Sequence, residues 1–166
     1  SLKGIKTKER GLKMEKGQNL NAPGKGSITV VDPIRKIKDI QAIYKILENE
    51  PRNHLLFTIG CNNGLRTGDI LNLKVEQIKN LKVGDSIKIR EQKTGKINTL
   101  VINKTVYKSL QRYLETVKPA DTDFVFKSKR GNSNKPITTQ MVNQLIKQWT
   151  KAINLKGNFG CHSLRK

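Results

Sequence analysis

Residues 64–73 read Gly-Leu-Arg-Thr-Gly-Asp-Ile-Leu-Asn-Leu, and this stretch decides which elements are expected on either side of it. It follows an almost continuous apolar run over residues 52–63 (RNHLLFTIGCNN), which is typical of a buried helix. Gly64 closes that helix, because glycine readily takes the left-handed conformation found at helix C-termini. The stretch itself predicts a short helix with Arg66 at its entry, so a guanidinium group is expected where two helices meet.

An amphipathic helix is predicted upstream, over residues 32–50 (DPIRKIKDIQAIYKILENE). Asp32 before Pro33 is a start signal, and Pro51 marks the end. Its apolar positions recur at helical spacing; they are Ile34, Ile37, Ile40, Ile43 or Tyr44, and Leu47.

Downstream, residues 77–102 change to a period of two, with Ile87 and Ile89 alternating with polar neighbours. A Lys-Thr-Gly-Lys turn follows, and β-rich residues come after it. This pattern predicts a β-hairpin whose tip carries Lys93 and Lys96.

Two further amphipathic helices are predicted, over residues 103–117 and 138–155, the second opened by a threonine cap. The first has its apolar positions on one side: Val106, Leu110, Tyr113, Leu114 and Val117. A short extended piece and a basic polar loop over residues 127–136 separate the two helices. The expected fold class is therefore mainly α with a small antiparallel β-sheet, that is, α+β.

Charge is the strongest compositional feature, since 33 Lys and Arg against 13 Asp and Glu give a net charge of +20. A compact domain with that excess repels itself, so a polyanionic partner is expected, nucleic acid first and an anionic membrane second. No apolar run approaches the roughly 20 residues that span a bilayer, which disfavours the membrane. Candidate DNA contacts lie after the hairpin turn and in the basic loop, and they are Lys96, Lys127, Lys129 and Arg130.

Residues 1–31 differ from the rest, being rich in Lys and Gly with few large apolar side chains. They are expected to form a basic flexible arm or linker that either stays solvated or touches DNA, while residues 32–166 form the folded domain. The two cysteines, Cys61 and Cys161, are too few for a disulfide framework and fit a reducing compartment such as the bacterial cytoplasm.

Four side chains together suggest chemistry on a phosphate: Arg66, Lys93, His162 and Arg165. Each alone is commonly a solvated or salt-bridged residue. Phosphodiester cleavage spreads negative charge over the non-bridging oxygens, which two guanidinium groups can hold with bidentate bonds. A lysine can deliver a proton to the leaving 5′ oxygen, and a histidine can donate a hydrogen bond or relay a proton. Positive side chains take the place of a metal here, so no metal or cofactor is expected.

The set resembles the catalytic domain of the tyrosine recombinases, the phage integrase family, over about residues 32–166. In that family an arginine lies in a Gly-Leu-Arg motif, with an acidic residue three positions on and a Leu-x-Leu after it. This chain reads Gly64-Leu65-Arg66, then Asp69, then Leu71-Asn72-Leu73. The resemblance implies a supporting role for Asp69, which either stabilises the local fold or holds an arginine in place.

The two other family motifs follow in the same order. The catalytic lysine of the family lies on the next hairpin, where Lys93 matches it and Lys96 fits less well because it follows the turn glycine. The His-x-x-Arg box matches His162-Ser163-Leu164-Arg165. If these last residues begin a helix, His162 and Arg165 lie one turn apart on one face.

The resemblance implies a site-specific recombinase of a phage or other mobile element, cutting and rejoining double-stranded DNA. In complete family members a tyrosine beyond the His-x-x-Arg box forms a 3′-phosphotyrosine, and the proteins self-associate on paired sites. The tyrosines here are Tyr44, Tyr107 and Tyr113, and none has that position. We therefore expect the chain to be truncated before the nucleophile and inactive alone.

Other interpretations stay open. A basic nucleic-acid-binding protein with no catalytic history, or a degenerate integrase that competes for DNA sites, would also account for the charge. A zinc site built from His54, Cys61, Cys161 and His162 is disfavoured, because their spacing matches no compact zinc pattern.

Overall fold

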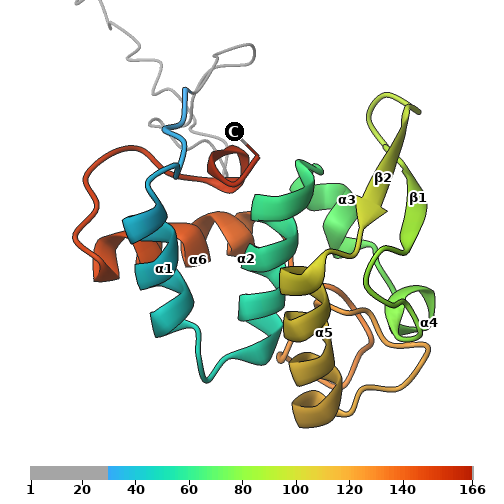
Figure 1. Ribbon diagram of the computed structural model, residues 1–166. Helices are drawn as coiled ribbons and strands as arrows, with labels where there is room; N and C mark the ends of the chain where they lie inside the picture. Colours follow the sequence, from blue (N-terminus) through green and yellow to red (C-terminus); the bar gives the residue numbers. More distant parts are fainter. Residues whose placement is uncertain (1–29, 166) are drawn as a thin grey trace, which may run out of the picture. The chain divides into compact units, whose positions relative to one another are not determined.

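Residues 30–165 are described by the computed structural model, so the segment predicted as a basic arm, residues 1–31, lies almost wholly outside them and stays a prediction. The elements of the described part (Figure 1) are α1 (Ile37–Ile46), α2 (Pro51–Asn63), α3 (Thr67–Leu71), α4 (Val75–Ile78), β1 (Ser86–Arg90), β2 (Ile97–Val101), α5 (Lys104–Val117), α6 (Thr139–Ala152) and a 3₁₀ turn, η1 (Cys161–Ser163). The two strands pair antiparallel, which confirms the expected fold class of mainly α with a small antiparallel sheet.

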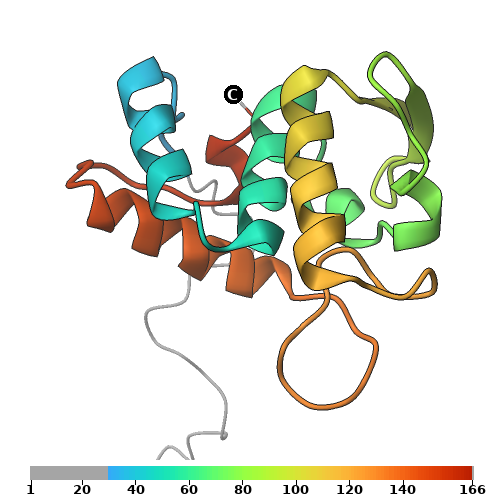
Figure 2. The same cartoon turned by 60° about the horizontal axis from the view of Figure 1, so that its bottom comes forward.

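Helix α2 is buried at the centre of this arrangement. Pro51 occupies its first turn, and Gly64 ends it with a φ of 60°, as the sequence predicts. Residues 55–60 are all buried, which is expected of a helix that is apolar on every side. In Figures 1 and 2, α2 lies between α1 and α5, and α6 runs at a steep angle to α1 and α2.

Helix α1 begins later than the sequence predicts. The expected start at Asp32-Pro33 is wrong, because Asp32 pairs with the segment after α6: its N–H donates to the Asn158 carbonyl at 2.7 Å, and its carboxylate accepts from the Asn158 N–H at 2.8 Å. The chain stays extended up to Lys36. The helical spacing counted from Ile34 is therefore broken, and Ile37 is 72% exposed although we expected it in the core.

The β-hairpin follows the prediction closely. The strands pair in register from Ser86 with Val101 to Arg90 with Ile97. At the tip the Gly95 N–H donates to the Glu91 carbonyl at 2.9 Å, and Gly95 has a φ of 70° that glycine tolerates without strain. The short helix α4 before the hairpin was not predicted.

Helices α5 and α6 both begin at polar caps. The Asn103 side chain accepts from the Val106 N–H at 2.8 Å, and the predicted threonine cap of α6 is Thr138, which accepts from the Met141 N–H at 3.1 Å. Along α5 the expected apolar stripe is buried at Val106, Leu110 and Tyr113, but Leu114 is only partly buried and Val117 is 46% exposed.

The closing residues begin with the 3₁₀ turn Cys161–Ser163, and Leu164 and Arg165 continue it as a turn without regular α-helix. Asn143 of α6 accepts from the Cys161 N–H at 2.7 Å, and Ser163 accepts from the Gly160 N–H at 3.0 Å. Leu164 packs directly on α2, where a Cβ added to Gly60 would lie 2.8 Å from its Cδ1. The turn is thus fixed between α6 and α2, and these contacts help to place His162 and Arg165.

Candidate active site

One pocket of about 410 Å³ collects all four side chains that the sequence singled out, Arg66, Lys93, His162 and Arg165. They come from the start of α3, the hairpin tip and the C-terminal turn. Figure 1 shows these three segments at the same end of α2. Thr139 and Asn143 at the start of α6 complete the lining on one side. The chain therefore concentrates positive charge at one place from segments about a hundred residues apart.

Arg66 is positioned by the junction of α2 and α3. It is the residue before the first turn of α3 and has an extended backbone. Its side chain is 28% exposed, and its Nε is buried without a hydrogen-bond partner among the described residues. A buried donor of this kind is costly unless a ligand or a shift of the side chain satisfies it.

Arg165 is held at the same junction. Its Nε donates to the carbonyl of Gly64, the residue that ends α2, at 2.7 Å. Its side chain is 31% exposed, so the remaining guanidinium donors are partly free to meet a ligand. Gly64 thus links the two arginines through the backbone, since it precedes one by two residues and accepts a bond from the other.

Lys93 lies exposed at the hairpin tip, and Asp69 fastens the tip to α3. The Asp69 carboxylate is buried and accepts from the N–H of Gln92, the neighbour of Lys93, at 3.1 Å. Through this hydrogen bond Asp69 connects α3 to the hairpin backbone. His162 lies exposed on the η1 turn.

Glu91 is a residue that the sequence analysis missed. Its side chain is 5% exposed, and its two oxygens lie 3.7 Å from Arg66 Nε and 4.0 Å from Arg165 Nη2. Hydrogen bonds from Thr94 and Asn98, with the two arginines, hold the pKa of this carboxyl below its usual value. One feature of the sequence could have identified Glu91: it is an acidic residue two positions before Lys93 in an otherwise basic hairpin.

The predicted DNA contacts lie in two places. Lys96 is exposed just after the turn glycine of the hairpin and does not line the pocket. Lys127 pairs with Asp123 at 3.1 Å, so part of its charge is neutralised. Lys129 lines a small depression with Pro51 at the start of α2. That is the opposite end of α2 from Arg66, and a helix of this length spans about 18 Å.

Arg130 neighbours Lys129 in the exposed loop after Phe126, at the end of the domain away from the hairpin (Figures 1 and 2). No residue of this loop lines the pocket around Arg66 and Arg165.

None of the three tyrosines lines this pocket. Tyr113 is buried, donates to the Val125 carbonyl at 2.8 Å, and has its pKa raised to about 12 by burial. Tyr44 packs against His54 and Phe57, with 5.0 Å between ring centroids in each case. Tyr107 packs partly buried against the core.

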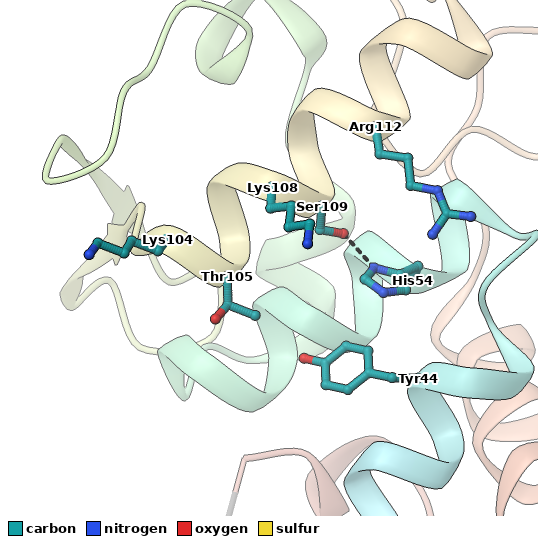
Figure 3. Close-up of a pocket in the computed structure, with 7 residues that line it drawn as sticks. All are labelled: Tyr44, His54, Lys104, Thr105, Lys108, Ser109 and Arg112. Atoms are coloured by element: carbon teal, nitrogen blue, oxygen red, sulfur yellow. Dashed lines mark hydrogen bonds between the residues drawn. The ribbon is translucent and has the colours of Figure 1, made fainter.

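A second and larger pocket, of about 490 Å³, lies between α1, α2 and α5 (Figure 3). Its basic lining comes from α5, and Figure 3 shows Lys108 and Arg112 pointing toward His54. His54 Nδ1 lies 2.7 Å from the hydroxyl of Ser109. That hydroxyl belongs to a buried residue, and no carboxylate lines the pocket to orient the imidazole, so the pair lacks the parts of a nucleophilic dyad.

Residues 30–165 contain neither a cluster of metal ligands nor a membrane-spanning helix. No three His, Cys, Asp or Glu side chains in that range come together in a group that could hold a metal. His54 and His162 line different pockets. No helix in the same range has the length and apolar character required to cross a membrane.

Comparison with solved structures identifies the class to which this fold belongs. The tyrosine recombinases share its architecture: the crystal structure of the XerA recombinase superposes with a TM-score of 0.65 at 20% identity, covering 82% of this chain and 49% of that one. A lambda integrase dimer bound to a COC' core site gives a TM-score of 0.60 at 20% identity, covering 84% and 40%.

The family follows from the sequence comparison. The sequence model of the phage integrase family matches residues 36–166. The chain therefore belongs to this family and is a tyrosine recombinase catalytic domain. The probable integrase/recombinase YoeC of Bacillus subtilis is 31% identical over 138 residues, which cover 82% of this chain and 72% of that protein. The tyrosine recombinase XerA of Pyrococcus horikoshii is 29% identical over 127 residues, but the match spans 42% of its length.

Proposed function

We propose that this chain provides the phosphate-binding part of a site-specific recombinase from a phage or other mobile element, which cuts and rejoins double-stranded DNA through a 3′-phosphotyrosine in the complete protein. The observation that carries the proposal is the meeting of Arg66, Lys93, His162 and Arg165 in one pocket. The solved relatives include a lambda integrase tetramer bound to a Holliday junction, which supports DNA as partner and self-association on it. A bacterial cytoplasm, near the nucleoid, is the proposed place of action.

The pocket suits a scissile phosphate that bridges the two arginines. Arg66 and Arg165 donate to the non-bridging oxygens, where negative charge grows as the bond to the leaving oxygen breaks. His162 donates a further hydrogen bond to the phosphate. Lys93, at the exposed hairpin tip, reaches toward the leaving 5′ oxygen and supplies its proton.

The attacking group is proposed to come from outside residues 30–165. Tyr113 is buried and bonded to a backbone carbonyl, and Tyr44 packs on the far pocket. Attack in line with the leaving oxygen needs a hydroxyl that reaches the phosphorus, and neither tyrosine lines the phosphate pocket. Tyr107, partly buried against the core, does not line it either.

A nicked suicide substrate with a labelled strand tests this function. The 166-residue chain should bind the duplex and form no covalent band, while the product of the complete reading frame should form one. Arg66→Ala in that product should give no band over the time in which the unchanged product forms one. If the 166-residue chain alone forms the band, and Tyr44→Phe, Tyr107→Phe or Tyr113→Phe removes it, the assignment of the nucleophile is wrong. If the complete product binds DNA without cleaving it, a non-catalytic DNA-binding protein is the better description.

A further inference from the structure

Glu91 is the carboxylate that approaches both arginines of the pocket within residues 30–165. One oxygen, Oε2, lies 3.7 Å from Arg66 Nε, and the other, Oε1, lies 4.0 Å from Arg165 Nη2. The residue is 4% exposed and does not belong to the lining of the pocket. It therefore lies behind the arginines, on the side away from a ligand.

The hairpin fixes this carboxylate in place. Thr94 donates its hydroxyl to Oε2 at 2.5 Å, and the Asn98 amide donates to Oε1. The Glu91 N–H also donates to the Lys96 carbonyl at 2.8 Å. Each oxygen is thus held by one hairpin side chain and faces one arginine, so Glu91 cannot follow either arginine without disturbing the turn that carries Lys93.

The two ion pairs are too long to be hydrogen bonds, which need about 3.2 Å or less between nitrogen and oxygen. Attraction therefore holds the guanidinium groups near Glu91 without using up their donors, and Arg66 Nε remains without a hydrogen-bond partner. The guanidinium nitrogens that do not face Glu91 belong to side chains that are 28% and 31% exposed, so they stay available for an oxyanion in the pocket.

Removing this charge has a predictable consequence. Two guanidinium groups that face one phosphate repel each other before the phosphate arrives, and a carboxylate between them offsets that repulsion. A buried carboxylate is itself costly unless it is paired and hydrogen-bonded, and here both conditions are met. The arginines and the carboxylate therefore depend on one another for their positions.

We propose that Glu91 is a positioning residue: fixed on the hairpin, it sets the spacing of Arg66 and Arg165 and couples both to Lys93, so that the pocket is arranged for a phosphodiester before DNA binds. This inference rests on the proposed function. Glu91 acts through the arginines and does not touch the phosphate. The consequence is that its loss impairs the chemical step more than DNA binding, since removing a negative charge favours the approach of a polyanion.

The substitution Glu91→Gln tests the inference, because glutamine keeps the size and most of the hydrogen bonding but not the charge. Asp85→Asn is the matched control: it removes one negative charge from the residue just before β1, at the end of the hairpin opposite its tip, where the carboxylate accepts from the Lys82 N–H and forms no ion pair with either arginine among the described residues. Both variants raise the net charge by one, so a general electrostatic effect appears in both.

In the complete reading-frame product, Glu91→Gln should slow covalent adduct formation at saturating DNA by about ten- to a hundredfold, which is the scale of a small misplacement. Its Kd for duplex DNA should stay within about threefold of the wild type or become tighter. Asp85→Asn should leave the adduct rate unchanged. Equal adduct rates for the two variants would overturn the inference, as would a loss of binding as large as the loss of rate.

A spectroscopic measurement on the 166-residue chain separates positioning from folding. The side-chain Nε–H signals of Arg66 and Arg165 should shift in Glu91→Gln and stay in place in Asp85→Asn, with unchanged backbone signals in the helices. Unmoved arginine signals would contradict the proposal, and so would melting of the hairpin. If the Arg66→Ala variant cleaves DNA at the normal rate, the proposed function is wrong. If Arg66→Ala loses cleavage while Glu91→Gln cleaves at the normal rate, only the proposed role of Glu91 is wrong.

Discussion

Two of the basic pockets between residues 30 and 165 each contain one of the two histidines. Around His162 the cations come from three separate parts of the chain, and a buried carboxylate, Glu91, lies behind the two arginines. Around His54 the cations follow one another along α5, and no acidic side chain lines the pocket. The pocket around His54 is the larger of the two, so size does not identify the candidate site.

The difference between the pockets shows what positive charge alone does not provide. Lysines on one helix face present flexible, strongly hydrated amines whose spacing is set only by the helix. The arginines around His162 are planar donors, one bonded to the backbone at Gly64 and both drawn to one fixed carboxylate. Under the proposed function, only the second arrangement is prepared to bind charge that develops during a reaction.

The largest expected effect tests whether charge alone governs DNA binding. With roughly six to ten phosphates contacted, affinity for duplex DNA should fall by about three to five orders of magnitude between 50 and 200 mM salt. Replacing Lys104 and Lys108 together should make the slope of log K against log salt concentration shallower by about two at most, and Arg66→Ala should make it shallower by about one. Fluorescence anisotropy at several salt concentrations measures the slope. A flat profile would count against DNA as the partner.

The second largest expected effect compares the two pockets by the rate of DNA strand cleavage. In the complete reading-frame product, Arg66→Ala or Arg165→Ala should slow strand cleavage by about 10²–10³-fold, the scale for removing one donor to a charged transition state. Arg112→Ala, in the other pocket, is the control and should leave the cleavage rate unchanged. Single-turnover cleavage at saturating DNA is the measurement. Equal losses from Arg112 and Arg66 would mean that the two pockets do not differ as described.

The sequence predicted much of the fold where signals were local. The apolar run of α2, the glycine that ends it, the threonine cap of α6 and the hairpin turn each act within a few residues, and the structure has all of them. The start of α1 was wrong because it depends on Asp32 pairing with Asn158, a contact across more than a hundred residues. The exposed Ile37 follows from the same contact.

The candidate site was predictable only in part, for a related reason. The four side chains belong to motifs with fixed spacing, so the sequence could name them and expect them to meet. Glu91 has no motif, and its importance depends on its distance to two arginines that lie far away along the chain. Burial of a charged residue of this kind is not visible in a hairpin pattern that alternates between exposed and partly buried positions.

A smaller effect concerns the contact that places the C-terminal turn. Gly60→Ala should lower the free energy of unfolding by about 1–3 kcal/mol, because the new Cβ would meet Leu164 Cδ1 at 2.8 Å. Gly68→Ala is the control, since nothing lies within 4 Å of its added Cβ, and it should be neutral or stabilising. Urea unfolding gives both values. The NMR signals of His162 should move in Gly60→Ala while those of His54 stay, and two variants of equal stability would refute the packing account.

The smallest effect belongs to the pocket around His54 and depends on pH. Burial, helped by the nearby Arg112 guanidinium, lowers the pKa of His54 below its ordinary 6.5. The unfolded chain therefore binds this proton at a higher pH than the folded chain does, so stability is complete above about pH 6.5 and falls as the pH drops through 6.5 toward the lowered pKa. The loss should stay below about 1 kcal/mol, because His54 is only partly buried and solvent screens it.

Thermal unfolding between pH 7.5 and 5 should show the decrease in the wild type, a smaller one in Arg112→Ala, and none from this group in His54→Gln. A decrease of the same size in His54→Gln would assign the dependence to another group. It would also mean that the imidazole of this pocket is as freely solvated as the lysines around it, and the larger pocket would then be a basic surface and no more.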